Sequence, residues 1–152
     1  MPIGNSDQTI EMVALSEMVN TMSGVGGWEF NLESESLIWT DQVRQIYELS
    51  GDYQPTLEEA LSFIPTASRA LARETIDNCI SDGTGWNLEL PLTTAKGREI
   101  WVQTMGRATY VDNRISSIVG TLQDISQKKS AQFKLEHSEK LARESTNELN
   151  VM

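Results

Sequence analysis

The sequence is poor in the residues on which most catalytic and metal sites depend. Its 152 residues include one cysteine, Cys79, and one histidine, His137. A single cysteine excludes a disulfide framework and a zinc site built on cysteines. A single histidine leaves no Ser-His-Asp arrangement and no metal-ligand spacing. We therefore expect neither an enzyme activity nor a metal site in this chain.

Basic residues are scarce as well: 12 Lys and Arg stand against 22 Asp and Glu, so the formal net charge is −10. Lys and Arg supply most of the affinity for nucleic-acid phosphates and for anionic membrane surfaces. We expect no nucleic-acid partner and no direct membrane binding. No apolar run approaches the ~20 residues of a membrane span, and the N-terminal residues lack the pattern of a secretory signal. A cytoplasmic protein is expected.

What the sequence does contain is an ordered series of short amphipathic segments. Residues 9–24 have apolar side chains near helical spacing, and residues 24–41 give two short alternating strands around a polar turn. Three helices follow within 40–51, 55–65 and 66–83, and then three strands joined by turns. Sequential hairpins need an antiparallel sheet, and helices between two strand groups must cover one of its faces. The order predicts one α+β domain.

The chain resembles a PAS domain of the PAC-containing, bacterial signalling type in two segments, "GGWEFNLESESLIWTDQVRQIYELSG" (26–51) and "GREIWVQTMGRATYVDNRISSIVGTLQDISQKK" (97–129). The resemblance implies a five-stranded antiparallel sheet in the order 2-1-5-4-3, with helices over one face and a small pocket between them. It divides the chain into an N-terminal amphipathic cap helix with its lead-in (1–25), a PAS domain (26–126) and a C-terminal coiled-coil signalling helix (127–152).

The resemblance also gives a role to the end of the last strand. Asp124, Ile125 and Ser126 stand where the family has its Asp-Ile-Thr signature, at the exit to the output helix. Serine replaces threonine here, and both residue types can cap a helix start. We expect these three residues to relay a change in strand packing to the helix that follows.

The same comparison with the family limits what the pocket can hold. Haem-binding relatives keep an axial histidine on the helices over the sheet, whereas His137 lies beyond the domain, which disfavours a His-ligated haem. Blue-light relatives bind flavin through an Asn-Cys-Arg-Phe run and a glutamine on the last strand. Here Cys79 lies in "IDNCISDG" and Leu122 takes the place of the glutamine, which disfavours a covalent flavin adduct. A small apolar or aromatic ligand, a non-covalent flavin, or no ligand remain as alternatives.

Alternation along the strands and helical spacing supply the pocket candidates. The last strand is expected to present Ile118, Gly120 and Leu122 inward, with a gap at the glycine, and Gln103, if inward, is the main polar group. Most buried aromatic residues of small domains are core, so Cys79 and most tryptophans have a structural alternative. The full set is Trp39, Tyr47, Leu71, Ile76, Cys79, Leu88, Trp101, Gln103, Ile118, Gly120 and Leu122.

The polar helix after Ser126 carries a weak repeat of small and apolar residues in steps of four and three, which is the a/d alternation of a left-handed coiled coil. This seam consists of Ala131, Leu135, Ser138, Ala142, Ser145 and Leu149. Its serines and alanines make it weak, and a solvated single helix is the alternative. Together with the family resemblance, the register favours a parallel homodimer. The helix continues to Met152 without a cap, which predicts a downstream output domain in the same chain.

These features predict a sensory module for signal transduction. It would sense a small ligand, a cofactor or the state of a partner domain, and relay the change through the Asp124–Ser126 junction and the coiled-coil helix. The output domain would be that of a histidine kinase, a cyclic-dinucleotide enzyme or a chemoreceptor. The alternative is a ligand-free module that only dimerises and relays motion from a neighbouring domain.

Overall fold

The computed structural model describes residues 24–151, and side-chain surroundings for residues 24–143. The predicted N-terminal cap helix therefore lies outside the described residues. The described elements are β1 (Val25–Asn31), β2 (Ser36–Trp39), α2 (Asp41–Tyr47), α3 (Leu57–Ser62), α4 (Thr66–Asp82), β3 (Trp86–Thr93), β4 (Glu99–Val111), β5 (Arg114–Asp124) and α5 (Ser126–Val151).

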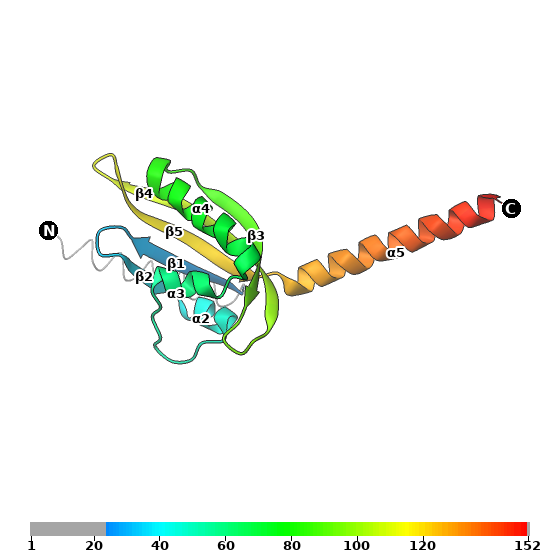
Figure 1. The fold of residues 1–152 in the computed structure, drawn as a ribbon, viewed down its shortest axis with the longest axis horizontal. Helices are drawn as coiled ribbons and strands as arrows, with labels where there is room; N and C mark the ends of the chain where they lie inside the picture. The colour runs from blue at the N-terminus through cyan, green and yellow to red at the C-terminus, as the bar shows by residue number, and fades with distance from the viewer. Residues whose placement is uncertain (1–23, 152) are drawn as a thin grey trace.

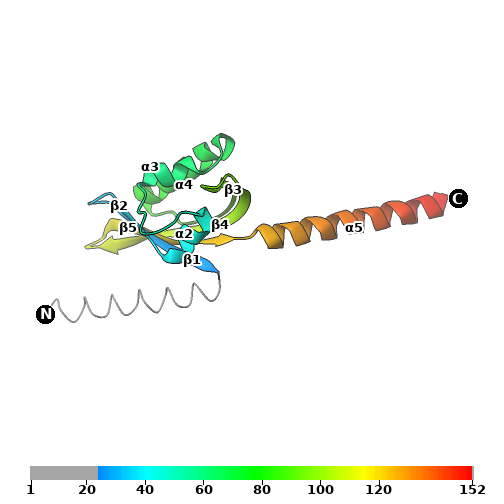
Figure 2. The same ribbon diagram turned by 90° about the horizontal axis from the view of Figure 1, so that it is seen from below.

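The five strands form one antiparallel sheet in the order β2-β1-β5-β4-β3. The first strand thus pairs with the last, and the β3-β4-β5 meander fills the other half (Figure 1). Helices α3 and α4 lie over one face of the sheet (Figure 2). The predicted α+β fold and the strand order 2-1-5-4-3 are confirmed.

The core lies between that face of the sheet and the helices, because successive side chains of a strand point to opposite faces. Burial of apolar area contributes about 25 cal/mol per Å², so the inward set fixes the register of each strand. The strands contribute Phe30, Leu37, Trp39, Leu90, Leu92, Ile100, Val102 and Leu122 to this core, and the helices contribute Val43, Ile46, Tyr47, Ala60, Leu61 and Ala72.

Local hydrogen bonds explain where the short helices start. The Thr56 hydroxyl accepts the Glu59 backbone N–H at 3.1 Å, which satisfies one of the unpaired donors at the start of α3. The Glu59 carboxylate accepts from the Tyr53 hydroxyl. Before α2, the Thr40 hydroxyl accepts the Gly27 N–H at 3.0 Å and makes no cap bond, so it joins the helix start to β1.

Helix α5 leaves the sheet and extends away from the domain (Figures 1 and 2). Between residues 131 and 143 every side chain is exposed, including Leu135 at 60% and Phe133 at 68%. The described part of the predicted seam therefore faces solvent in this single chain, whereas the side chains of Ser145 and Leu149 lie outside the described range. Among the described helices none is long and apolar enough to cross a membrane.

Candidate functional site

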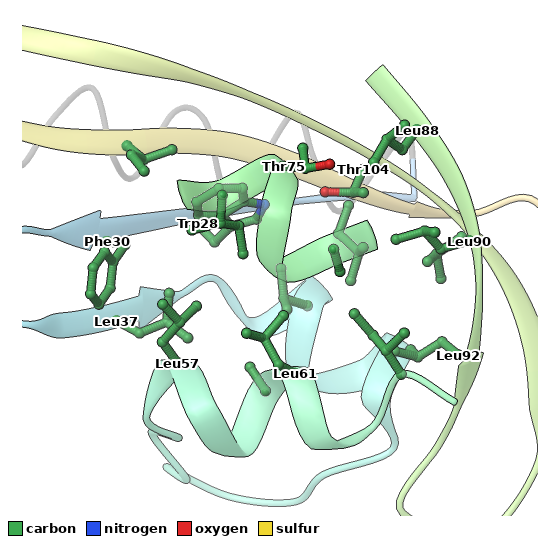
Figure 3. A pocket seen from close by; sticks show the side chains of 18 of the residues that line it. Trp28, Phe30, Leu37, Leu57, Leu61, Thr75, Leu88, Leu90, Leu92 and Thr104 are labelled. Atoms are coloured by element: carbon green, nitrogen blue, oxygen red, sulfur yellow. The ribbon is translucent and has the colours of Figure 1, made fainter. Parts of the chain in front are cut away.

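A cavity of about 90 Å³ lies between the sheet and helices α2, α3 and α4. Its walls come from all five strands and three helices, so residues far apart in the sequence meet there (Figure 3). Six of the predicted pocket residues line it, namely Trp39, Tyr47, Ile76, Leu88, Ile118 and Leu122. The inward direction of these six residues follows from the periodicity of their strands and helices.

Two predicted pocket residues on β4, Trp101 and Gln103, are not part of the lining. Trp101 is 41% exposed, and the Gln103 amide donates to the Asn87 side-chain oxygen at 2.9 Å on the outer face. Their neighbours Val102 and Thr104 line the cavity instead. The correction follows from the strict alternation of a strand, because inward Val102 forces Trp101 and Gln103 outward.

Two predicted residues on α4 are also corrected. Leu71 is 49% exposed, because α4 faces the sheet with Ala72, Thr75 and Ile76, about a quarter turn away from Leu71. Cys79 is fully buried but lies beyond the lining that α4 supplies, so it is a structural thiol and not a cavity group.

The predicted gap at Gly120 is filled by the indole ring of Trp28, which is not among the predicted pocket residues. A Cβ on Gly120 would lie 2.4 Å from Cζ2 of Trp28, and one on Gly106 would lie 2.4 Å from Cζ2 of Trp86. The four residues form one row across the sheet, Trp28–Gly120–Gly106–Trp86. Both glycines lack the side chain that would hold the rings apart. The indoles therefore stack over them with centroids 5.7 Å apart and an interplanar angle of 21°.

These two tryptophans line the cavity, so its tryptophans are Trp28, Trp39 and Trp86 instead of Trp39 and Trp101. The sequence pattern of a single strand cannot predict that Trp28 and Trp86 stack, because their stacking depends on the register of three pairs of strands. The one indication in the sequence is the presence of Gly106 and Gly120 within two neighbouring strands, because glycine is disfavoured in the interior of a sheet and often marks a close approach of another group.

The cavity is uncharged. Among the described residues that line it there is no Asp, Glu, Lys, Arg or His. Tyr47 is the one phenol, and burial raises its pKa well above the ordinary value of 10.0, so it stays neutral at physiological pH. Its hydroxyl donates weakly to the Ala60 carbonyl at 3.5 Å. No cluster of His, Cys, Asp and Glu within the described range could hold a metal ion.

The predicted relay residues meet at the backbone of Trp101. The Asp124 carboxylate accepts the Ser126 N–H at 2.9 Å, and the Ser126 hydroxyl accepts the Trp101 N–H at 3.0 Å. Between them, Ile125 is buried and its N–H donates to the Trp101 carbonyl at 2.8 Å. The start of α5 is therefore hydrogen-bonded to β4 through both backbone polar groups of one residue, Trp101.

Lys129, which the sequence did not single out, adds a side-chain contact one turn into α5. Its ammonium lies 2.5 Å from the Glu89 carboxylate and 4.9 Å from the centroid of the Trp101 ring. The hydrogen bond from Lys129 lowers the pKa of Glu89, which keeps this carboxylate charged. Trp101 and Glu89 are thus the outer-face contacts of α5, and their neighbours Val102, Leu88 and Leu90 line the cavity.

Several solved structures share this fold. A sensory box histidine kinase/response regulator from Burkholderia thailandensis is 18% identical, with a TM-score of 0.63 over 84% of this chain and 96% of that chain. The N-terminal domain of a diguanylate cyclase with a PAS/PAC sensor from Marinobacter aquaeolei is 11% identical, with a TM-score of 0.64 over 69% and 98%. A light-oxygen-voltage domain described with a flavin analogue is 12% identical, with a TM-score of 0.58 over 80% and 93%. At these identities the likeness shows the fold alone.

Comparison with the curated proteins finds no match. The family model described as the PAS fold matches residues 36–122, which is more than half of the chain. The matched range runs from the start of β2 to Leu122, near the C-terminal end of β5, and contains nearly all of the cavity lining. With the sheet order and the cavity between sheet and helices, this match shows that the chain belongs to the PAS fold family, whose members are regulatory sensor modules.

Proposed function

We propose that this chain is a sensory module that takes a small ligand into the cavity and relays its presence through the Asp124–Ser126 junction to α5 and an output domain. The observation that carries the proposal is the uncharged, aromatic-lined cavity next to the strands that hold α5. Similar folds occur in a histidine kinase and a diguanylate cyclase, which supports an output domain of that kind.

The volume limits the ligand. An apolar cavity of about 150 Å³ binds benzene, whereas this one measures about 90 Å³. A flavin carries three fused rings, so it does not fit unless the stacked Trp28 and Trp86 separate. The similarity to a light-oxygen-voltage domain therefore supports the fold, and the geometry favours a ligand of a few heavy atoms over a flavin.

A route from the cavity to α5 runs through β4. Val102 lines the cavity and pairs with Asp124, while Trp101 beside it holds Ile125 and Ser126. A ligand that shifts β4 therefore moves the groups that orient the start of α5. It can shift the equilibrium only by its difference in affinity between the two arrangements.

Filling the cavity tests ligand binding. We expect Ala72→Leu to place an isobutyl group in the cavity and to lower binding at least about tenfold, because a close-packed site has no room for both groups. Ala70→Leu on the exposed side of α4 is the matched control. Native mass spectrometry of the freshly purified chain should show an added mass in the wild type and in Ala70→Leu that is missing in Ala72→Leu. A wild-type chain with no added mass would favour the ligand-free relay module.

The proposal includes pairing of two α5 helices along the predicted seam. Leu135→Glu puts a charge into that seam, and we expect the dimer dissociation constant to rise at least about tenfold, since an a/d position tolerates charge poorly. Phe133→Glu is the control, because Phe133 is equally exposed but lies on the opposite side of α5. Sedimentation equilibrium separates the outcomes. Equal dissociation by both variants, or a monomeric wild-type chain, contradicts pairing along this seam.

A further inference from the structure

The cavity is lined by a few polar side chains, and some of them can still form a hydrogen bond with a ligand in addition to the bonds they make within the protein. The indole N–H of Trp28 donates to the Thr121 carbonyl at 3.4 Å, and that of Trp86 donates to the Thr104 hydroxyl at 3.4 Å. Each indole has one donor and no acceptor, so both are satisfied. The remaining side-chain hydroxyls belong to Tyr47, which donates to Ala60, and to two threonines.

These two threonines, Thr75 on α4 and Thr104 on β4, direct their hydroxyl oxygens toward one another in Figure 3. The Thr75 hydroxyl donates its proton to the Leu71 carbonyl at 2.8 Å, so its oxygen is left as an acceptor. The Thr104 oxygen accepts from Trp86, so its proton is left as a donor. The cavity thus presents one acceptor and one donor from opposite walls.

We infer that Thr75 and Thr104 form a subsite for a hydroxyl group, and that the ligand class is a small, uncharged, short-chain alcohol. This inference rests on the proposed function, because it names the ligand of the same cavity. A hydroxyl group has one donor and two acceptor sites, so it can donate to the Thr75 oxygen and accept from the Thr104 hydroxyl at once. A carbonyl or ether leaves the remaining acceptor capacity of the Thr75 hydroxyl unused, and a hydrocarbon leaves both that capacity and the Thr104 proton unused.

The rest of the lining agrees with this class. An ammonium or carboxylate would meet no opposite charge among the described lining residues, and a buried unpaired charge is strongly disfavoured. The apolar chain of the alcohol would lie against Trp28, Trp86 and Leu88. Since the volume of about 90 Å³ is smaller than that of a benzene-binding cavity, only a few carbons fit.

A matched pair of probes tests the subsite. 1-Propanol and 1-chloropropane differ by one group of similar size, and the chloride is the more apolar of the two. A merely apolar cavity prefers 1-chloropropane, whereas a hydroxyl subsite prefers 1-propanol by about tenfold, because two hydrogen bonds are gained. Titration of the wild-type chain followed by amide and methyl NMR shifts measures both dissociation constants.

Substitutions of the two threonines test whether they cause the preference for 1-propanol. Thr75→Val and Thr104→Val keep the side-chain shape and remove one hydroxyl each, and we expect both to bind 1-chloropropane at least as well as 1-propanol. Thr121→Val on the outer face is the control and should keep the wild-type preference. If 1-chloropropane binds the wild type more tightly, the hydroxyl subsite is wrong while a ligand cavity stands. If neither probe binds, or if Ala72→Leu binds both unchanged, the proposed function fails as well.

Discussion

Replacing Gly120 by alanine is expected to lower the free energy of unfolding by about 3 kcal/mol, the top of the usual range for overpacking. The added Cβ would lie 2.0 Å from the Met105 carbonyl oxygen and 2.4 Å from the Trp28 ring. The ring can rotate away, but the carbonyl belongs to the neighbouring strand β4, which is paired along its length with β5. Relief therefore requires the two central strands to separate.

Gly106→Ala is the matched control for this prediction. It adds the same methyl group in the same row of the sheet, but its three nearest contacts are all atoms of the Trp86 ring. A side chain can yield where a paired backbone cannot, so we expect about half the loss. Urea unfolding with a common slope measures both values. For a domain of this size, 3 kcal/mol corresponds to a fall in Tm of roughly 12–24 °C. A loss below about 1 kcal/mol for Gly120→Ala would show that the strands adjust freely.

Removing the side-chain contacts of two residues at the junction is expected to release α5 from its fixed direction. Ser126→Ala takes away the acceptor for the Trp101 N–H, and Lys129→Met takes away the ammonium that contacts Glu89 and the Trp101 ring. In the double variant the helix start keeps its backbone bond to Trp101 but loses all three of these side-chain contacts. A swing of about 30° then moves position 140 by roughly 11 Å, because a helix rises about 1.5 Å per residue.

Spin labels at Asp112→Cys and Lys140→Cys measure this swing by pulsed electron resonance, with excess unlabelled chain to suppress distances between copies. Cys79 is fully buried and stays unlabelled. We expect one narrow distance in the wild type and a distribution broader by roughly 10 Å in the double variant. Lys128→Met with Gln127→Ala is the control, because both residues are exposed on the same turn. Equal widths in all three chains would mean that the Ile125 bond alone directs α5.

The fold could be predicted from the sequence because its strands and turns carry local signals. Alternation on β5 placed Ile118 and Leu122 inward, and the turns of the β3-β4-β5 meander dictated an antiparallel sheet. On β4 the same rule was ambiguous, because Ile100 and Val102 on one face compete with Trp101 and Met105 on the other. Only pairing with β3 and β5 decides between two apolar faces.

The candidate site could be predicted only in part, because its defining contacts are between elements. On α4 the apolar residues are few, so Leu71 was as good a candidate for the inward face as Ala72. Thr75 and Thr104 have no local pattern at all, and they become a pair only when the helix packs on the sheet. In the sequence Lys129 is one charge among many on a polar helix, and only the packing of α5 against the sheet brings it to Glu89 and Trp101.

The stacked indoles of Trp28 and Trp86 also give the protein an intrinsic spectroscopic signal that depends on the geometry of the cavity. Two aromatic chromophores whose ring centroids lie 5.7 Å apart couple their electronic transitions, and the sign and size of the resulting near-ultraviolet dichroism depend on their mutual angle. Any occupant that tilts one ring changes that signal, while Trp101 on the outer face contributes a background independent of the pair. The near-ultraviolet circular dichroism of the unlabelled chain therefore reports whether the cavity is occupied.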